Sequence, residues 1–315
     1  MLSPPSNGQP GDNTVTPANV QGRILICAGS DSSGGAGVQA DIKTVTALGG
    51  YALTAITALT AQNTQGVSDI HMIPPAFIAR QMQACLEDIG ADVIKTGMLA
   101  TVAVIRTVGT ILATMAPLVP LVVDPVMVAN GGTVLLAIEA IHALKVHLLA
   151  RAALITPNLP EAAALLGQDV PLDTPEAMRT AACRLLDLTP NGPQAVLLKG
   201  GHRVGGEVVD VLATRAGLTI PFVHPRIAST STHGTGCTLA TAIACGLAQG
   251  MTLTASVERA RRYVYKAIAT APGFGHGHGP LNHGHTICAE CPREEEKGGK
   301  RLVGATGIEP VTPRV

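Results

Sequence analysis

The sequence predicts an α/β fold, in which a central and mostly parallel β-sheet carries helices on both faces. Short apolar runs without alternation, such as R-I-L-I-C-A-G and L-V-V-D-P-V-M, are typical of strands that are covered on both faces. Segments of helical periodicity separate these runs from position 23 onward. Such a regular alternation of strands and helices favours a doubly wound sheet in one domain.

The chain supplies the expected elements in order. A strand over 23–29 ends in the glycine-rich loop S-D-S-S-G-G-A-G, which precedes a helix over 38–48. Further strands are predicted over 51–61, 92–96, 121–127, 154–158 and 195–202. Further helices are predicted over 75–89, 102–113, a segment ending near 149, 160–167, 175–186, the residues after 236, and 256–270.

Two further segments are predicted to be neither parallel strands nor helices. The segment 205–220 alternates β-branched residues around R-A-G, so we expect a small hairpin there, the one antiparallel piece of the sheet. The cluster Q-N-T-Q-G, which follows the strand over 51–61, is expected to leave the sheet.

Composition separates the ends of the chain from this domain. Residues 1–20 are rich in Pro, Gly, Asn and Ser and lack apolar periodicity, so we expect a disordered extension. The charged segment 286–315 is expected to be a disordered tail. Residues 21–285 then form the predicted domain.

Charge and hydropathy exclude several classes of function. The 22 basic and 22 acidic residues balance, so we expect neither nucleic acid nor a membrane surface as a partner. The sequence has no uninterrupted apolar run long enough for a membrane-spanning helix, and the N-terminus has no basic segment followed by an apolar one. We therefore expect a cytoplasmic protein with reduced cysteines, of which four fall in predicted strands or helices and should be small core residues: Cys27, Cys85, Cys183 and Cys245.

A second glycine-rich turn, S-T-S-T-H-G-T-G-C-T-L, runs without a spacer into a predicted helix. The unpaired N–H groups and the dipole at a helix N-terminus attract an anion, and Gly234 and Gly236 let the backbone approach it. Cys237 falls on the first turn, where the same field should lower the pKa of its thiol. The alternative is a glycine turn before an ordinary packed helix.

Polar residues follow several predicted strands, on the edge where doubly wound sheets bind ligands. Each one alone is well explained as a cap, a turn residue or a solvated charge. Together they provide two carboxylates that could hold Mg²⁺ through water, a lysine and an anion site, which are the groups that phosphoryl transfer uses. These residues are Asp124, Asn158, Glu161, Lys199 and Cys237.

Several ordered phrases resemble the hydroxymethylpyrimidine/phosphomethylpyrimidine kinases of thiamine biosynthesis, which belong to the ribokinase-like superfamily. The phrases are A-G-S-D-S-S-G-G-A-G-V-Q-A-D-I-K-T, T-A-L-T-A-Q-N-T-Q-G-V, K-T-G-M-L, V-D-P-V-M, L-I-T-P-N-L-P-E-A, L-L-K-G-G-H and T-H-G-T-G-C-T-L. The resemblance implies a homodimer that uses ATP and Mg²⁺ to phosphorylate 4-amino-5-hydroxymethyl-2-methylpyrimidine. It also implies that the resulting monophosphate is phosphorylated to the diphosphate.

The resemblance also implies roles for individual residues. Gly234, Thr235 and Gly236 would form the anion hole for the transferring phosphate. Cys237 stands where many ribokinase-like enzymes have an Asp base, and would take the proton from the hydroxymethyl group.

The remaining roles concern the substrate, the metal and the nucleotide. The side-chain amide of Gln62 would read the pyrimidine, because an amide both donates and accepts hydrogen bonds. Asn158 and Glu161 fit the superfamily's N-x-x-E pattern for Mg²⁺, with Asp124 nearby, and Lys199 would face the nucleotide phosphates. The pyrimidine pocket would be completed by Gly29, Asp41, Met98 and Val126.

Three alternatives remain at this point. Pyridoxal kinases share the scaffold and the G-x-G-C ending, so Gln62 favours the pyrimidine while a dual activity stays open. A binding or regulatory protein without turnover would have lost the base or the anion glycines, and both are present. C-A-E-C has a spacing compatible with zinc, although G-H-G-x-G-P resembles the usual C-terminal end of the family, which needs no metal; the residues concerned are His276, His278, His283, His285, Cys288 and Cys291.

Overall fold

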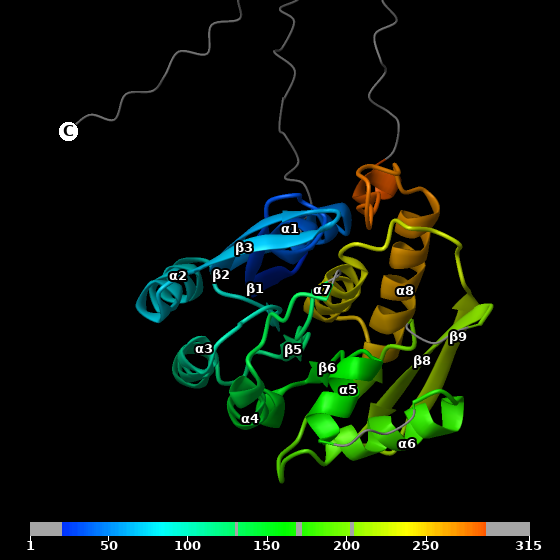
Figure 1. Cartoon of the computed structure of the whole chain (residues 1–315). Helices are drawn as coiled ribbons and strands as arrows, with labels where there is room; N and C mark the ends of the chain where they lie inside the picture. Colours follow the sequence, from blue (N-terminus) through cyan, green and yellow to red (C-terminus); the bar gives the residue numbers. More distant parts are fainter. Residues whose placement is uncertain (1–20, 130–131, 168–171, 202–204, 288–315) are drawn as a thin grey trace, which may run out of the picture.

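One mixed β-sheet forms the centre of the molecule (Figure 1). The computed structural model describes residues 21–129, 132–167, 172–201 and 205–287. In this part of the chain the strands lie in the order β3-β2-β1-β4-β5-β6-β7-β8-β9. The six central strands, β2, β1, β4, β5, β6 and β7, run parallel to one another. Strand β3 pairs antiparallel with β2, β8 with β7, and β9 with β8. The predicted fold class is confirmed.

Most elements start and end close to the predicted positions. The strands are β1 (Arg23–Asp31), β2 (Tyr51–Asn63), β3 (Gly66–Met72), β4 (Val93–Thr96), β5 (Leu121–Val123), β6 (Leu154–Ile155), β7 (Ala195–Leu198), β8 (Glu207–Thr214) and β9 (Thr219–Pro225). The helices are α1 (Gly37–Ala47), α2 (Pro75–Asp88), α3 (Val102–Met115), α4 (Ile138–His147), η1 (Leu149–Arg151), α5 (Leu159–Leu166), α6 (Pro175–Leu186), α7 (Thr235–Ala248), α8 (Leu253–Ala269) and η2 (His283–Thr286).

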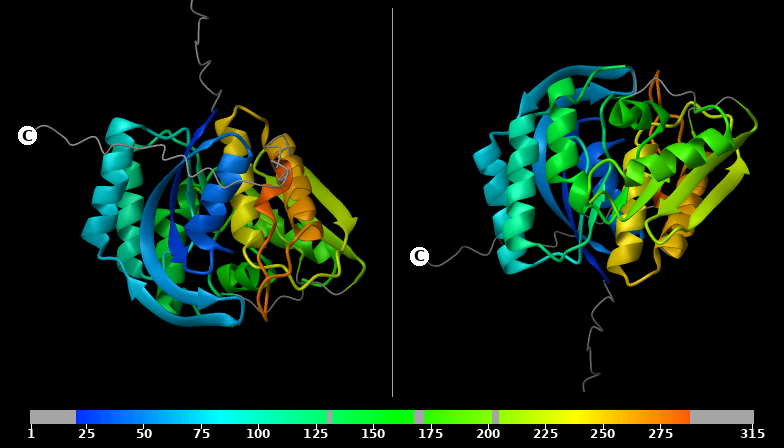
Figure 2. Two further views of the ribbon diagram at one scale, coloured as in Figure 1. Left: turned by 90° about the horizontal axis from the view of Figure 1, so that it is seen from above. Right: turned by 90° about the horizontal axis from the view of Figure 1, so that it is seen from below.

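Helices cover both faces of the sheet, so two hydrophobic cores flank it (Figure 2). Helices α1, α7 and α8 pack on one face, and α2 to α6 pack on the other. In β1, Ile24 and Ile26 enter the first core while Leu25 and Cys27 enter the second, and all four are completely buried. Burial on both faces explains why this strand has an apolar run without alternation.

The strand β3 was not predicted. The cluster Q-N-T-Q-G does not leave the sheet, because β2 continues to Asn63 and the chain returns in β3 as an antiparallel partner. The Asn63 side chain accepts hydrogen bonds from the backbone N–H groups of Gln65 (2.8 Å) and Gly66 (3.2 Å) and so closes the turn. As an exposed edge strand, β3 lacks the apolar run that marked the buried strands. The predicted hairpin over 205–220 is confirmed as β8 and β9, but β3 shows that it is not the one antiparallel piece of the sheet.

The thiols and the chain ends complete the comparison. Cys27 and Cys245 are buried as predicted, whereas Cys183 is exposed on α6 and is not a core residue. The predicted extension 1–20 and all but two residues of the predicted tail 286–315 lie outside the described residues.

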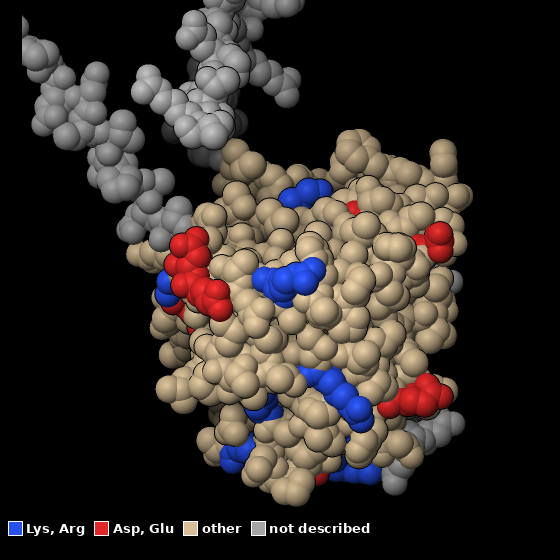
Figure 3. Space-filling model, turned by 90° about the vertical axis from the view of Figure 1, so that its left-hand side faces the viewer, with Lys and Arg blue, Asp and Glu red and all other residues tan. Residues whose placement is uncertain are grey.

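The described helices include none that is long and apolar enough to span a membrane. On the face in Figure 3, charged residues of both signs are scattered among uncharged ones.

Candidate active site

A cavity of about 740 Å³ lies at the carboxyl ends of the parallel strands. The strand order reverses between β2-β1 and β1-β4, and open α/β sheets bind ligands at such a switch point. All but one of the predicted site residues line this cavity: Gly29, Gln62, Met98, Asp124, Val126, Asn158, Glu161, Lys199, Gly234, Thr235, Gly236 and Cys237.

The exception is Asp41, and its predicted place in the pyrimidine pocket is wrong. Its side chain is completely buried within α1 and does not line the cavity. The carboxylate accepts hydrogen bonds from Lys95 Nζ (2.8 Å) and from Thr241 Oγ1 (2.6 Å). Both of these partners lie behind the wall of the cavity.

The glycine turn before α7 is a helix N-terminus, as predicted. Gly234 is the N-cap residue, with a left-handed φ of 81°, and α7 begins at Thr235. A Cβ atom at Gly234 would collide with the carbonyl oxygen of Gly35 in the first glycine-rich loop. Both the φ angle and the close approach therefore require glycine. The residues of this first turn line the cavity, where a helix N-terminus would stabilise an anion, although the Thr235 N–H already donates to the Thr232 carbonyl oxygen (3.3 Å).

Cys237 lies on that first turn and lines the cavity. The prediction that its thiol pKa is lowered is wrong. Burial raises the pKa of Cys237 to about 11, although the nearby charge of Lys95 lowers it. The loss of solvent is the largest cause, and it raises the pKa of the thiol more than the charge of Lys95 lowers it. Once deprotonated, such a thiolate is a strong base.

Lys199 forms an ion pair at the edge of the anion turn. Its Nζ lies 2.9 Å from Asp124 Oδ1, which also accepts a hydrogen bond from Thr156 Oγ1 (3.0 Å). Burial raises the pKa of Asp124, but the charges of Lys199 and Lys95 and the hydrogen bonds from Lys199 and Thr156 together outweigh burial, so the net shift is downward. Lys199 Nζ and Asp124 Oδ2 lie 3.3 and 3.8 Å from the point where a Cβ of Gly236 would stand. A cation and an anion therefore border the place for a phosphate.

The N-x-x-E pattern forms a capping box at the start of α5. The Asn158 side chain accepts from the Glu161 backbone N–H, and the Glu161 carboxylate accepts from the Asn158 backbone N–H, each at 2.8 Å. Burial raises the pKa of Glu161, and the negative charge of Asp124 raises it further. A bound cation would relieve this repulsion between two carboxylates.

Mg²⁺ fits this donor set. It is held in proteins by one or two carboxylates together with water and substrate phosphates. Asp124 and Glu161 offer two carboxylates beside the anion turn, while the Asn158 oxygen is already engaged in the cap. The described residues contain no group of three or more His, Cys, Asp or Glu side chains that could hold a metal ion. Cys288 and Cys291 of the zinc hypothesis lie outside the described residues.

Gln62, near the end of β2, lies at the end of the cavity that residues of β1 and β2 line. Its Oε1 accepts a hydrogen bond from Thr60 Oγ1 (3.0 Å), and its Nε2 lies 3.4 Å from Nε2 of His233. Gly29 and Met98 line the same end, with the Met98 sulfur 3.1 Å from the point where a Cβ of Gly29 would stand. An oriented amide therefore borders a small apolar wall.

Sequence reasoning missed Asp31 and His233. The Asp31 carboxylate accepts hydrogen bonds from Ser33, Gly35 and Ala36 and lies 2.8 Å from His233 Nε2. Burial on its own raises the pKa of Asp31, but the hydrogen bonds from His233, Ser33 and Ala36 lower it to about 2. The aspartate before S-S-G-G was a usable signal, because Asp commonly caps such turns.

Sequence reasoning also missed the part of the cavity next to α8. It lies between the β8–β9 hairpin and α8, and apolar and aromatic side chains line it: Val208, His224, Ile227, Val264, Tyr265 and Ile268. Tyr265 and His224 meet edge to face, with ring centroids 5.5 Å apart. Such a wall can accommodate a planar heterocycle.

Residues 31–282 match the model of the phosphomethylpyrimidine kinase family. The chain belongs to this family. The thiamine biosynthesis bifunctional protein ThiED of Geobacter sulfurreducens is 51% identical over 84% of this chain. The match covers only 52% of the length of that relative. The hydroxymethylpyrimidine/phosphomethylpyrimidine kinase of Streptomyces coelicolor is 42% identical over 86% of this chain and 98% of its own length.

Solved structures agree with this membership. The phosphomethylpyrimidine kinase of Clostridium difficile is 39% identical, with a TM-score of 0.67 over 78% of this chain and 99% of its own. The pyridoxal kinase of Bacillus subtilis, solved with ADP, is 32% identical, with a TM-score of 0.75 over 84% of this chain and 98% of its own. The pyridoxal kinase of Staphylococcus aureus, solved with AMP-PCP and pyridoxal, is 32% identical, with a TM-score of 0.74 over 84% of this chain and 94% of its own.

Proposed function

We propose that this chain transfers the terminal phosphate of ATP to the hydroxymethyl group of 4-amino-5-hydroxymethyl-2-methylpyrimidine. It then phosphorylates the monophosphate to the diphosphate, as a step of thiamine biosynthesis. The observation that carries the proposal is the continuity of the cavity. One space connects the Gln62 end, the anion turn with Cys237, and the aromatic end at Tyr265.

Each part of the cavity has a task in this reaction. The Gln62 amide, fixed by Thr60, orients the pyrimidine ring so that its hydroxymethyl group faces Cys237. Cys237 removes the proton from that hydroxyl as it attacks. The N–H groups of Gly234, Thr235 and Gly236 stabilise the charge on the transferring phosphate, because they are already oriented before the reaction.

The charges around the anion turn complete the mechanism. Lys199 neutralises negative charge beside Gly236, and its ion pair with Asp124 holds the ammonium there. Mg²⁺ would be held by Asp124 and Glu161, through water and the nucleotide phosphates, and would supply further charge neutralisation. The adenine of ATP would lie against Tyr265, between the β8–β9 hairpin and α8.

Pyridoxal is the second candidate substrate. Relatives that are named pyridoxal kinases have higher TM-scores to this chain than the phosphomethylpyrimidine kinase of Clostridium difficile. The sequence identities rank in the opposite order. The amide at Gln62, which can pair with both a ring nitrogen and an exocyclic amine, favours the pyrimidine.

The test is a coupled assay of ADP release with ATP and Mg²⁺ on one preparation of the protein. Parallel reactions receive the hydroxymethylpyrimidine, its monophosphate or pyridoxal. We expect the highest kcat/KM for the first two. Release at the background rate with both pyrimidines would contradict the proposal, and turnover of pyridoxal alone would reassign the substrate.

A homodimer in the cytoplasm remains a prediction. Sedimentation of the purified protein at several concentrations tests the assembly, and we expect twice the mass of the chain. Fractionation of cells that produce the chain tests the location.

A further inference from the structure

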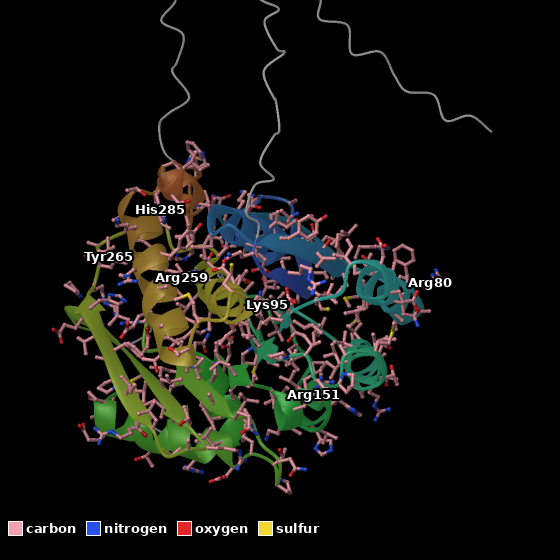
Figure 4. The ribbon with its side chains drawn as sticks, turned by 180° about the vertical axis from the view of Figure 1, so that it is seen from behind. Arg80, Lys95, Arg151, Arg259, Tyr265 and His285 are labelled. Carbon is pink, nitrogen blue, oxygen red and sulfur yellow. The ribbon has the colours of Figure 1, made fainter. Side chains whose placement is uncertain are left out.

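A charged pair is completely buried beside α7. The ammonium of Lys95, on β4, lies 2.8 Å from Asp41 Oδ2, and both side chains are 0% exposed. Thr241 Oγ1 donates to the other oxygen of Asp41 at 2.6 Å. Figure 4 shows Lys95 in the interior of the molecule, next to α7.

This pair is not explained by stability. Removing two charges from water costs about as much as their attraction returns, so apolar side chains of similar volume would stabilise the site equally well. Ile94 on β4 and Val122 on β5 are apolar and fully buried, and Thr96 is the polar neighbour of Lys95 on β4. A function for the charge is therefore the question to ask.

The ammonium lies directly behind the reaction centre. Its Nζ is 3.3 Å from the point where a Cβ of Gly97 would stand, and Gly97 lines the cavity. Thr241, which binds Asp41, is one helical turn after Cys237 on α7. On the other side, the backbone of Gly37, the first residue of α1, lowers the pKa of Cys237 slightly.

We propose that Lys95 is a positioning residue for the reaction, a fixed cation that stabilises the thiolate of Cys237, and that Asp41 and Thr241 hold its ammonium in place. The link to turnover rests on the proposed role of Cys237 as the base. The effect on the thiol itself does not depend on that role.

Four charged groups act on Cys237, and their balance agrees with the proposal. Burial raises the pKa of the thiol most, Lys95 lowers it, and Asp41 and Asp124 raise it to a smaller extent than Lys95 lowers it. Lys199 also interacts with the thiolate from the end of β7. Lys95 is thus the largest of the charges that oppose the cost of burial.

The decisive variant removes both charges of the buried pair. In K95M/D41N, methionine keeps most of the lysine volume and the asparagine oxygen still accepts from Thr241. The readout is the rate of alkylation of Cys237 by iodoacetamide from pH 7 to pH 10, followed by peptide mass spectrometry. The exposed Cys183 in the same molecule is the internal control for reagent and fold.

We expect Cys237 alkylation in K95M/D41N to be slower by about tenfold at a given pH, which corresponds to one pKa unit, with Cys183 unchanged. The single variant D41N leaves Lys95 without its counter-charge and should speed alkylation. In the kinase assay, kcat of K95M/D41N should fall and its pH profile shift to higher pH, while both KM values stay within about twofold. A folded K95M/D41N with the wild-type pH dependence of Cys237 alkylation would overturn the proposal. Absence of kinase activity in the wild type would contradict the proposed function and leave the alkylation result intact.

Discussion

The imidazole of His233 lies 2.8 Å from the carboxylate of Asp31, although the two residues are 202 positions apart. This contact joins the glycine-rich loop after β1 to the anion turn before α7. The Asp31 carboxylate also organises its own loop through Ser33, Gly35 and Ala36. A buried side-chain pair therefore fixes the glycine-rich loop after β1 and the anion turn to one another.

Replacing Asp31 by Asn should cost about 1 to 3 kcal/mol in the free energy of unfolding, because buried donors lose a charged acceptor. The pKa of Asp31 falls to about 2 on folding, so its contribution is present above the ordinary Asp value and is lost as pH falls towards 2. Urea unfolding at neutral and acid pH measures this. The exposed Asp69→Asn is the control, and equal losses in both variants would be inconsistent with the pairing.

Gly234→Ala should destabilise the protein and lower kcat by about 100-fold or more, because a Cβ meets the Gly35 carbonyl and displaces the N–H groups of the turn. Gly250→Ala is a matched control. Gly250 has a similar φ of 77°, follows the end of the same helix and has open space around its Cβ position. It should cost only about 1 to 2 kcal/mol and keep full activity. Similar kcat values for the two variants would exclude a special role for Gly234.

Gln62→Met should lower kcat/KM for the pyrimidine by about 10- to 100-fold, because the substrate loses an amide partner in a buried site. KM for ATP should stay unchanged. Gln65→Met, on the exposed turn of the same hairpin, is the control. Steady-state kinetics with pyrimidine and pyridoxal measure both effects, and an unaltered ratio between the two substrates would remove Gln62 from substrate recognition.

Glu161→Gln should raise the Mg²⁺ concentration for half-maximal rate by about tenfold or more, since one of two carboxylates is lost. The glutamine oxygen can still accept from the Asn158 backbone, so the cap of α5 is retained. Glu176→Gln, in the exposed first turn of α6, controls for the change of surface charge. A metal titration of the rate provides the measurement, and coincident curves would assign Glu161 to the cap alone.

The sequence was informative where one residue type has one physical explanation. Apolar runs such as that of β1 predict buried strands, and the glycines of the anion turn predict a close backbone approach. The ends of strands can be placed from these runs, and with them Asp124, Asn158, Glu161 and Lys199. The edge strand β3 lacked such a run, and it was missed.

The sequence was less informative where the outcome depends on burial and distant partners. The helix N-terminus before Cys237 suggested a lowered thiol pKa, but burial, which no local pattern reports, raises it. Asp41 fits a family phrase, yet only the packing of α1 against β4 and α7 shows that it binds Lys95. The pairing of Asp31 with His233 depends on a contact between distant turns, which a single sequence does not encode visibly.

The most direct test is mass spectrometry of the products formed from the hydroxymethylpyrimidine, ATP and Mg²⁺ by the wild type and by Cys237→Ala. The wild type should form the monophosphate and then the diphosphate, at a rate that rises with pH, because the thiol pKa is raised to about 11 and the base must be deprotonated. Cys237→Ala should be slower by about 10² to 10⁴, with Cys183→Ala unchanged. Formation of both products by Cys237→Ala at the wild-type rate would contradict the assigned base, and the absence of phosphorylated pyrimidine in the wild type would contradict the proposed kinase.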